Sequence, residues 1–112
     1  MKVPKPTEAD MQRFRSLVPD DDPRVTVKPM FGNLGGFVNG NMFVGLFGSD
    51  VGVKLAPDDA AELLAIDGAG PYGPAERPMS GWVTLPAAFL TPDASRPWVQ
   101  RALDHVATMK PK

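Results

Sequence analysis

The dipeptide Asn39-Gly40 constrains the fold of this chain more than any other feature of its sequence. It separates two apolar runs, residues 35–38 and residues 41–47. Asn-Gly between such runs is typical of a type I′ turn, because that turn needs positive φ at both central residues. We therefore predict an antiparallel hairpin centred on this dipeptide.

Two further strands are predicted beside the hairpin. A tight turn at residues 48–50 leads into an apolar segment at 51–55, and residues 24–28 alternate between polar and apolar side chains. Pro29 is expected to close the latter strand, since proline cannot donate a ladder hydrogen bond. Residues 24–55 thus predict an antiparallel meander of three or four strands.

Three other segments carry apolar residues at helical spacing behind good helix starts. They are residues 7–18 with Thr7 as cap, residues 57–68 with Gly68 as the stop, and a last helix capped by Asp93 or Ser95 and ending at Met109. A further strand is expected at 82–85. Helices segregated from an antiparallel sheet predict a two-layer α+β fold, formed by one domain over residues 1–112.

The central strand predicts a sheet with large apolar side chains on both faces. Strict alternation puts Met42, Val44 and Leu46 on one face, and Phe43 and Phe47 on the other. An antiparallel sheet with one solvated face does not need aromatic residues on both sides. Either helices wrap around the strand ends, or the second face contacts a partner, for which a second copy of the chain is one expectation.

Composition narrows the classes of function. Lys and Arg number 12 against 13 Asp and Glu, whereas proteins that hold nucleic acid through phosphates carry a basic excess, so we expect no direct nucleic-acid binding. The absence of cysteine removes disulfides, thiolate metal sites and thiol nucleophiles. No apolar stretch approaches the roughly 20 residues that span a bilayer, and the N-terminus does not resemble a secretory signal. We expect a cytoplasmic protein without membrane contact.

The sequence predicts no catalytic residues, no metal site and no cofactor. Residues 68–73 match a dinucleotide fingerprint formally, but they follow a helix and run into Pro74 instead of opening a helix, so we interpret the match as chance. Residues 32–36 lack the Lys-Ser/Thr ending of a phosphate-binding loop and are interpreted as a plain turn. His105 is the only histidine, which leaves a catalytic triad or a two-histidine metal site without support.

Arg77 lies in a loop rich in glycine and proline, between Tyr72 and Trp82. Its guanidinium could stack on an aromatic ring or bind an anionic group. The alternative is a structural role, in which Arg77 donates to carbonyls of its own loop. The first alternative suggests a small-ligand or anion-binding domain centred on Arg77, Lys54 and Tyr72.

An ordered set of short motifs resembles the TfoX N-terminal domain family, whose best-known members regulate bacterial competence. The motifs are Met30-Phe31-Gly32, Asn39-Gly40-Asn41-Met42-Phe43, Lys54-Leu55, Gly70-Pro71-Tyr72, Arg77-Pro78-Met79, Trp82-Val83-Thr84-Leu85-Pro86 and Trp98-Val99-Gln100-Arg101-Ala102. The resemblance spans nearly the whole chain. It implies a bacterial, stand-alone domain with a two-layer fold like that of type III secretion chaperones, and it implies no catalytic residues.

Together these observations predict a non-enzymatic protein-interaction module, with a role as a cofactor in transcription or competence regulation. The partner is an unidentified protein, and a homodimer is a further expectation. The candidate partner or ligand contacts are Met30, Phe31, Asn39, Phe43, Lys54, Tyr72, Arg77 and Met79. The alternative function is the small-ligand or anion-binding domain centred on Arg77.

Overall fold

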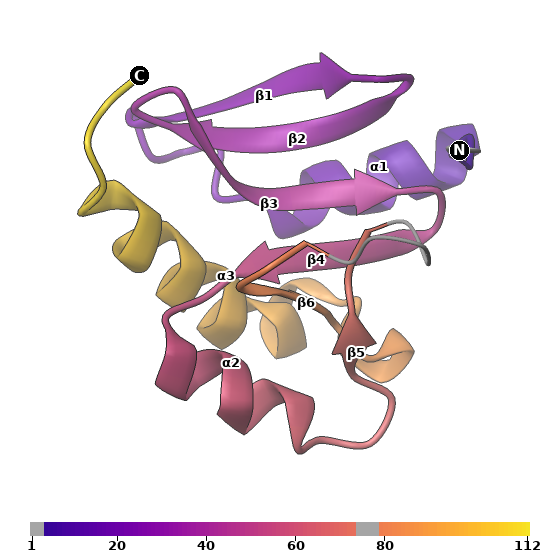
Figure 1. The fold of residues 1–112 in the computed structure, drawn as a ribbon. Helices are drawn as coiled ribbons and strands as arrows, with labels where there is room; N and C mark the ends of the chain where they lie inside the picture. The colour runs from indigo at the N-terminus through magenta and orange to yellow at the C-terminus, as the bar shows by residue number, and fades with distance from the viewer. Residues whose placement is uncertain (1–3, 74–78) are drawn as a thin grey trace.

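An open antiparallel sheet forms one layer of the computed structural model, which describes residues 4–73 and 79–112 (Figure 1). In these residues the sheet has six strands in the order β1-β2-β3-β4-β6-β5. The strands are β1 (Val25–Met30), β2 (Asn33–Val38), β3 (Asn41–Phe47), β4 (Asp50–Lys54), β5 (Gly70–Pro71) and β6 (Trp82–Thr84). The first four follow one another as a meander, as the turn pattern of the sequence predicts.

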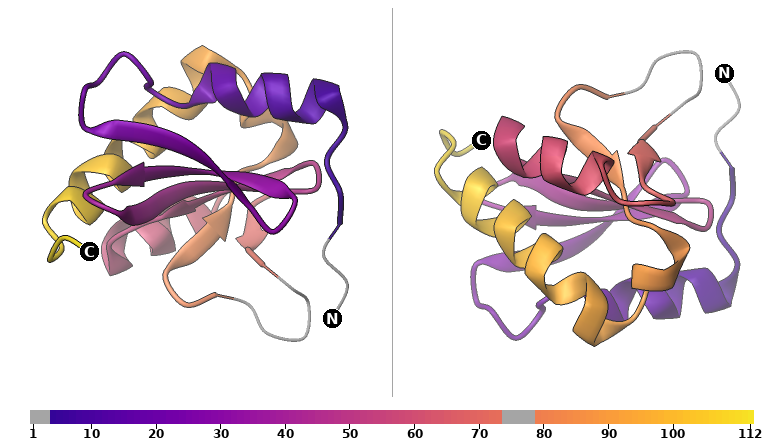
Figure 2. Two further views of the ribbon diagram at one scale, coloured as in Figure 1. Left: turned by 90° about the horizontal axis from the view of Figure 1, so that it is seen from above. Right: turned by 90° about the horizontal axis from the view of Figure 1, so that it is seen from below.

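The described residues form three α-helices, of which the two longer ones make up the second layer (Figure 2). They are α1 (Glu8–Leu17), α2 (Pro57–Leu64) and α3 (Pro92–Ala107), with a short 3-10 helix at Ala87–Phe89. Figure 2 shows α1 and α3 on the same side of the sheet, while α2 lies at its β6 end. Segregated helices on an antiparallel sheet confirm the α+β class.

The helix ends agree with the sequence only in part. Thr7 caps α1 in a reciprocal capping box with Asp10, as helix-start preferences predict. The predicted cap of α3 is wrong: Thr91 accepts from the amide of Ala94, because Pro92, with its fixed φ, occupies the first helical turn. The predicted stop of α2 is also wrong, since the helix ends at Leu64.

The Asn39-Gly40 hairpin is confirmed, with φ of 53° and 81° at its two central residues. A second hairpin of the same geometry was not predicted. Phe31 and Gly32 have φ of 50° and 82° and join β1 to β2. The expected end of β1 at Pro29 is wrong, because β1 is an edge strand and needs hydrogen bonds on one side only. Residues 32–36, interpreted from the sequence as a plain turn, belong to β2 except for Gly32.

A β-bulge in β3 changes the faces predicted from strict alternation. The register with β2 passes from Gly36↔Val44 to Phe37↔Met42, which leaves Phe43 without a partner. A Cβ at Gly36 would lie close to Phe43, Val44 and Val18 at the end of α1, so these side chains share the helix side. The predicted faces of Met42 and Phe43 are thus wrong, because the extra residue turns Phe43 into the core and Met42 away from it.

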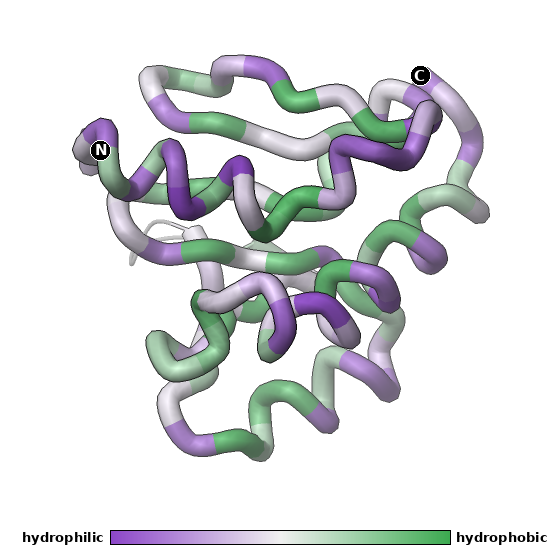
Figure 3. The backbone as a smooth tube through the Cα atoms, turned by 180° about the vertical axis from the view of Figure 1, so that it is seen from behind, coloured by the Kyte–Doolittle hydropathy of each residue, from purple (hydrophilic) through white to green (hydrophobic). Residues whose placement is uncertain are grey.

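The core lies between the sheet and the helices. Figure 3 shows apolar and polar residues alternating along α1 and α3, as expected of helices that are buried on one side. The largest fully buried side chains of the core are Phe14, Phe43, Leu63 and Leu103, and buried valines of the strands belong to the same core. In α2 only Leu63 is buried, whereas Leu64, assigned to the same apolar stripe, is 49% exposed.

We predict that Phe43→Ala lowers the free energy of unfolding by about 3–5 kcal/mol, because it leaves a cavity in the core. Phe37→Ala is the matched control, since Phe37 is half-buried on the opposite face and should cost clearly less. Urea denaturation of both variants measures the difference. Equal losses would contradict the position of Phe43 given by the bulge.

Candidate functional site

A row of glycines crosses the sheet face that is turned away from α1 and α3, called here the second face. Gly35 pairs with Gly45, and Gly45 pairs with Gly52, so the three glycines lie side by side on β2, β3 and β4. Directly paired residues of antiparallel strands present their side chains to the same face. The row therefore leaves a shallow strip of backbone without side chains across the middle of the sheet.

Met42 and Tyr72 fill this strip. A Cβ at Gly35 would lie 2.8 Å from Sδ of Met42, and one at Gly45 would lie 2.8 Å from the hydroxyl oxygen of Tyr72. At Gly52 a Cβ would overlap Cγ and Cδ1 of the Tyr72 ring. Glycine inside a strand often marks the close approach of another group, and here it allows the tyrosine ring to lie against the backbone.

Tyr72 is the centre of an aromatic cluster. Its ring stacks on Trp82 with centroids 5.3 Å apart, and it meets the edge of Phe47 at 6.1 Å. The carbonyl of Tyr72 accepts from the amide of Met79 at 2.9 Å, and the carbonyl of Met79 accepts from Trp82 at 3.2 Å. The chain itself thus covers this part of the second face. Large apolar side chains on both faces of the sheet therefore do not require a partner here.

The phenol of Tyr72 is held in its neutral form. Burial raises its pKa well above the ordinary value, and the nearby carboxylate of Asp50 adds to the effect. At neutral pH the side chain therefore packs as an uncharged ring.

Toward β1 the second face is less covered. Phe37 and Met42 are half-buried here, as is Phe47 at the edge of the Tyr72 cluster, and the ammonium group of Lys28 lies 5.0 Å from the centroid of the Phe37 ring. Lys28 pairs with Gly35 and so belongs to this face. The result is a partly exposed apolar strip with a cationic rim.

Phe31 stands at the tip of the β1–β2 hairpin and is 85% exposed. Its φ of 50° lies in the left-handed region, which is costly for a residue with a Cβ and rare for bulky side chains. Met30 precedes it and is half-buried. The tip therefore combines a largely exposed aromatic ring and a strained backbone.

The structure brings together only some of the candidate contacts. Tyr72, Met79 and Lys54 all lie beside Trp82. Tyr72 stacks on its ring, the carbonyl of Met79 accepts from its amide, and Lys54 pairs with it in the register of β4 and β6. Met30 and Phe31 lie at one end of β2, and Asn39 lies at the other end, where its carbonyl accepts from the amide of Lys112.

Two candidates have a different status. Phe43 is fully buried and has no surface for a partner to contact. Arg77 lies outside the described residues, so the ligand site centred on it stays a hypothesis from the sequence. The glycine row was missed by sequence reasoning, although glycines inside three expected strands were a usable signal.

Within residues 4–73 and 79–112, no group of three His, Asp or Glu side chains is placed to hold a metal ion. In the same part of the chain no helix has the length and apolar character needed to cross a membrane. Residues 68–73, which formally match the dinucleotide fingerprint, follow α2 and contain β5. They therefore lack the strand-then-helix order that the motif needs.

Comparison with known proteins agrees with the resemblance seen in the motifs. The family model of the TfoX N-terminal domain matches residues 20–106 of the 112-residue chain. No curated protein matches the chain. No solved structure matches it either.

We predict that Gly52→Ala destabilises the protein by about 1–3 kcal/mol, because the new methyl group collides with the Tyr72 ring and must displace it. Gly70→Ala is the matched control, since Gly70 is also in a strand and has open space at its Cβ position. Chemical denaturation compares the two. A Gly52→Ala variant as stable as the control would contradict the packing of Tyr72 on the glycine row.

A second prediction concerns the pH dependence of stability. Below the pKa of the unfolded phenol, about 10, the folded and the unfolded protein both keep the proton, so the free energy of unfolding does not depend on the ionisation of Tyr72. Above that pH only the unfolded protein loses the proton, so the free energy of unfolding falls as pH rises. The Tyr72→Phe variant should lack this fall. Tyr72 is the only tyrosine, so phenolate absorbance reports on it alone. Folded protein that gains phenolate absorbance at the ordinary pKa would refute the burial argument.

Proposed function

Because the chain belongs to the TfoX N-terminal domain family, we propose that it is a non-enzymatic bacterial protein-interaction module that acts as a regulatory cofactor in the cytoplasm. Its contact surface consists of Phe31, Met30 and the partly exposed strip of Phe37, Met42 and Phe47, and we call it the Phe31 surface. The partner is another protein, which this surface binds through aromatic and apolar side chains.

The observation that carries the proposal is the state of Phe31. Left-handed backbone costs a residue with a Cβ about 1–2 kcal/mol, and the exposed ring gains no burial in return. Asn39 shows the alternative, because it occupies the equivalent position of the neighbouring hairpin with a residue that tolerates this backbone. Phe31 therefore costs the free protein stability, and binding is the process that would use its ring.

The surroundings of Phe31 fit a protein interface. Aromatic residues and methionine are enriched in the buried centre of interfaces, while charged residues lie at the rim. Here Phe37, Met42 and Phe47 supply the apolar strip, and Lys28 supplies a cation beside it. The side chains that the surface offers are suited to packing and not to acid–base chemistry, which supports a binding role over an enzymatic one.

We predict that Phe31→Asn has opposite effects on folding and on binding. It should raise the free energy of unfolding by about 1 kcal/mol, because asparagine tolerates positive φ. It should also abolish capture of the partner when the variant replaces the wild-type chain as bait in an extract of the source bacterium. The control bait is Leu64→Asn, which removes another exposed apolar side chain, on α2 and away from this surface.

A protein that is captured by the wild type and by Leu64→Asn, but lost by Phe31→Asn, supports the proposal. Capture that is equal for all three baits would overturn the role of Phe31. No captured partner, together with unchanged transcript levels after deletion of the gene, would overturn the regulatory role. Light scattering of the wild type and of Phe31→Asn decides whether the partner is a second copy of the chain.

A further inference from the structure

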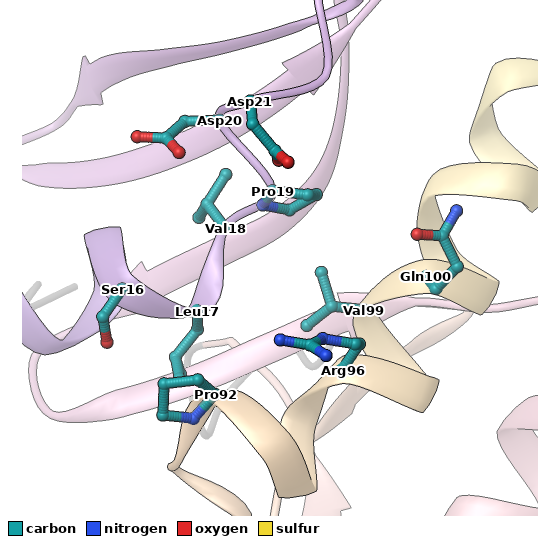
Figure 4. Close-up of a pocket in the computed structure, with 10 residues that line it drawn as sticks. All are labelled: Ser16, Leu17, Val18, Pro19, Asp20, Asp21, Pro92, Arg96, Val99 and Gln100. Carbon is teal, nitrogen blue, oxygen red and sulfur yellow. The ribbon is translucent and has the colours of Figure 1, made fainter.

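A cleft of about 510 Å³ lies on the helix side of the molecule, away from the Phe31 surface. Figure 4 shows it between the end of α1, the turn that follows α1, and the first turns of α3. Leu17, Val18 and Val99 lie beneath the cleft and are almost fully buried, so the surface that the cleft offers is mainly polar. A volume of this size is within the range of small-molecule sites.

Charges of opposite sign line the two walls of the cleft. The α3 wall carries Arg96, and the wall formed by the turn after α1 carries Asp20 and Asp21. The ion pairs formed within the described residues involve Arg13, Arg24 and Arg101 as cations, so Arg96 and these two aspartates are not paired with one another. The cleft is therefore dipolar, and its charged groups are available to a ligand.

The ends of the helices reinforce this polarity. The first turn of α3 bears the positive end of the helix dipole on the side of Arg96, and the last turn of α1 bears a negative end on the side of the aspartates. Ser16 lines the cleft at the end of α1, apart from the two aspartates (Figure 4), and its hydroxyl donates to the carbonyl of Arg13. Both walls thus favour one orientation of a dipolar guest.

We propose that this cleft binds a small zwitterion, of the class of free amino acids and dipeptides. The carboxylate of the ligand contacts Arg96, and its ammonium group contacts Asp21. The aspartates repel dianions, and Arg96 repels dications, so the arrangement selects molecules that carry one charge of each sign. This site shares no residue with the Phe31 surface and does not depend on the proposed function.

Three probes of nearly equal shape test the proposal. L-leucine carries both charges, 4-methylpentanoate lacks the ammonium group, and 3-methylbutylamine lacks the carboxylate. Each is titrated into the isotope-labelled protein while the amide signals of Ser16, Val18 and Gln100 are followed by NMR. We expect saturable shifts with leucine, and binding about fivefold weaker for each of the other two, since one solvent-exposed ion pair contributes up to about 1 kcal/mol.

Charge-neutral variants assign each contact. Arg96→Gln should remove the advantage of leucine over 3-methylbutylamine, and Asp21→Asn should remove its advantage over 4-methylpentanoate. Arg15→Gln is the matched control, because it changes the same charge on the exposed side of α1, outside the lining of the cleft. It should leave all three affinities unchanged.

The side chains concerned are exposed, so the variants should fold, and their amide spectra verify this in the same experiment. The absence of saturable shifts with leucine would overturn the site. Leucine binding that is equal to that of 4-methylpentanoate, or unchanged by both Arg96→Gln and Asp21→Asn, would overturn the zwitterion specificity. Loss of partner capture by Phe31→Asn has no bearing on either result.

Discussion

The ring of Tyr72 packs against the backbone of Gly52 with its hydroxyl group beside Gly45, and the character of the second face depends on this contact. The glycines provide the space, and the stack on Trp82 and the edge of Phe47 fill the rest of the cluster. An aromatic ring that packs on bare backbone excludes water from the middle of the sheet without a helix above it. The sheet is therefore covered on one side by helices, and on the other side its own returning chain covers it over β3 and β4.

This arrangement separates the molecule into two sides of different character. On the helix side the floor of the dipolar cleft consists of core residues, so its shape is fixed by the same packing that stabilises the fold. On the other side the Phe31 surface begins where the cover by Tyr72 ends. The two surfaces share no residues, and a ligand in one could affect the other only through the sheet between them.

Ion pairs of Arg101 connect α3 to α2. The guanidinium of Arg101 on α3 contacts Asp59 and Glu62 on α2, at 3.3 and 2.9 Å, and lies 4.5 Å from the ring centroid of Trp98. These groups are partly exposed, so each ion pair contributes little by itself. Their value is geometric, because α2 buries only Leu63 and needs a further contact to fix its position beside α3.

The elements that local chemistry dictates were predictable from sequence. Asn39-Gly40 specified its hairpin, Thr7 specified the start of α1, and the helical spacing of Val99, Leu103 and Val106 specified the buried face of α3. The motifs also indicated the family that the family model confirms. In each case the residue's own backbone preference, or the period of its neighbours, carries the information.

Only the tertiary structure decided which side chains meet. The bulge at Phe43 moves this residue into the core and Met42 onto the second face, and no local pattern reports an extra residue in a strand. The glycine row exists only once the register aligns Gly35, Gly45 and Gly52, and the cleft exists only once α1 and α3 lie side by side. Sequence determines local conformation through interactions between near neighbours, whereas these features arise from contacts between distant segments, which become specified only when the whole core packs.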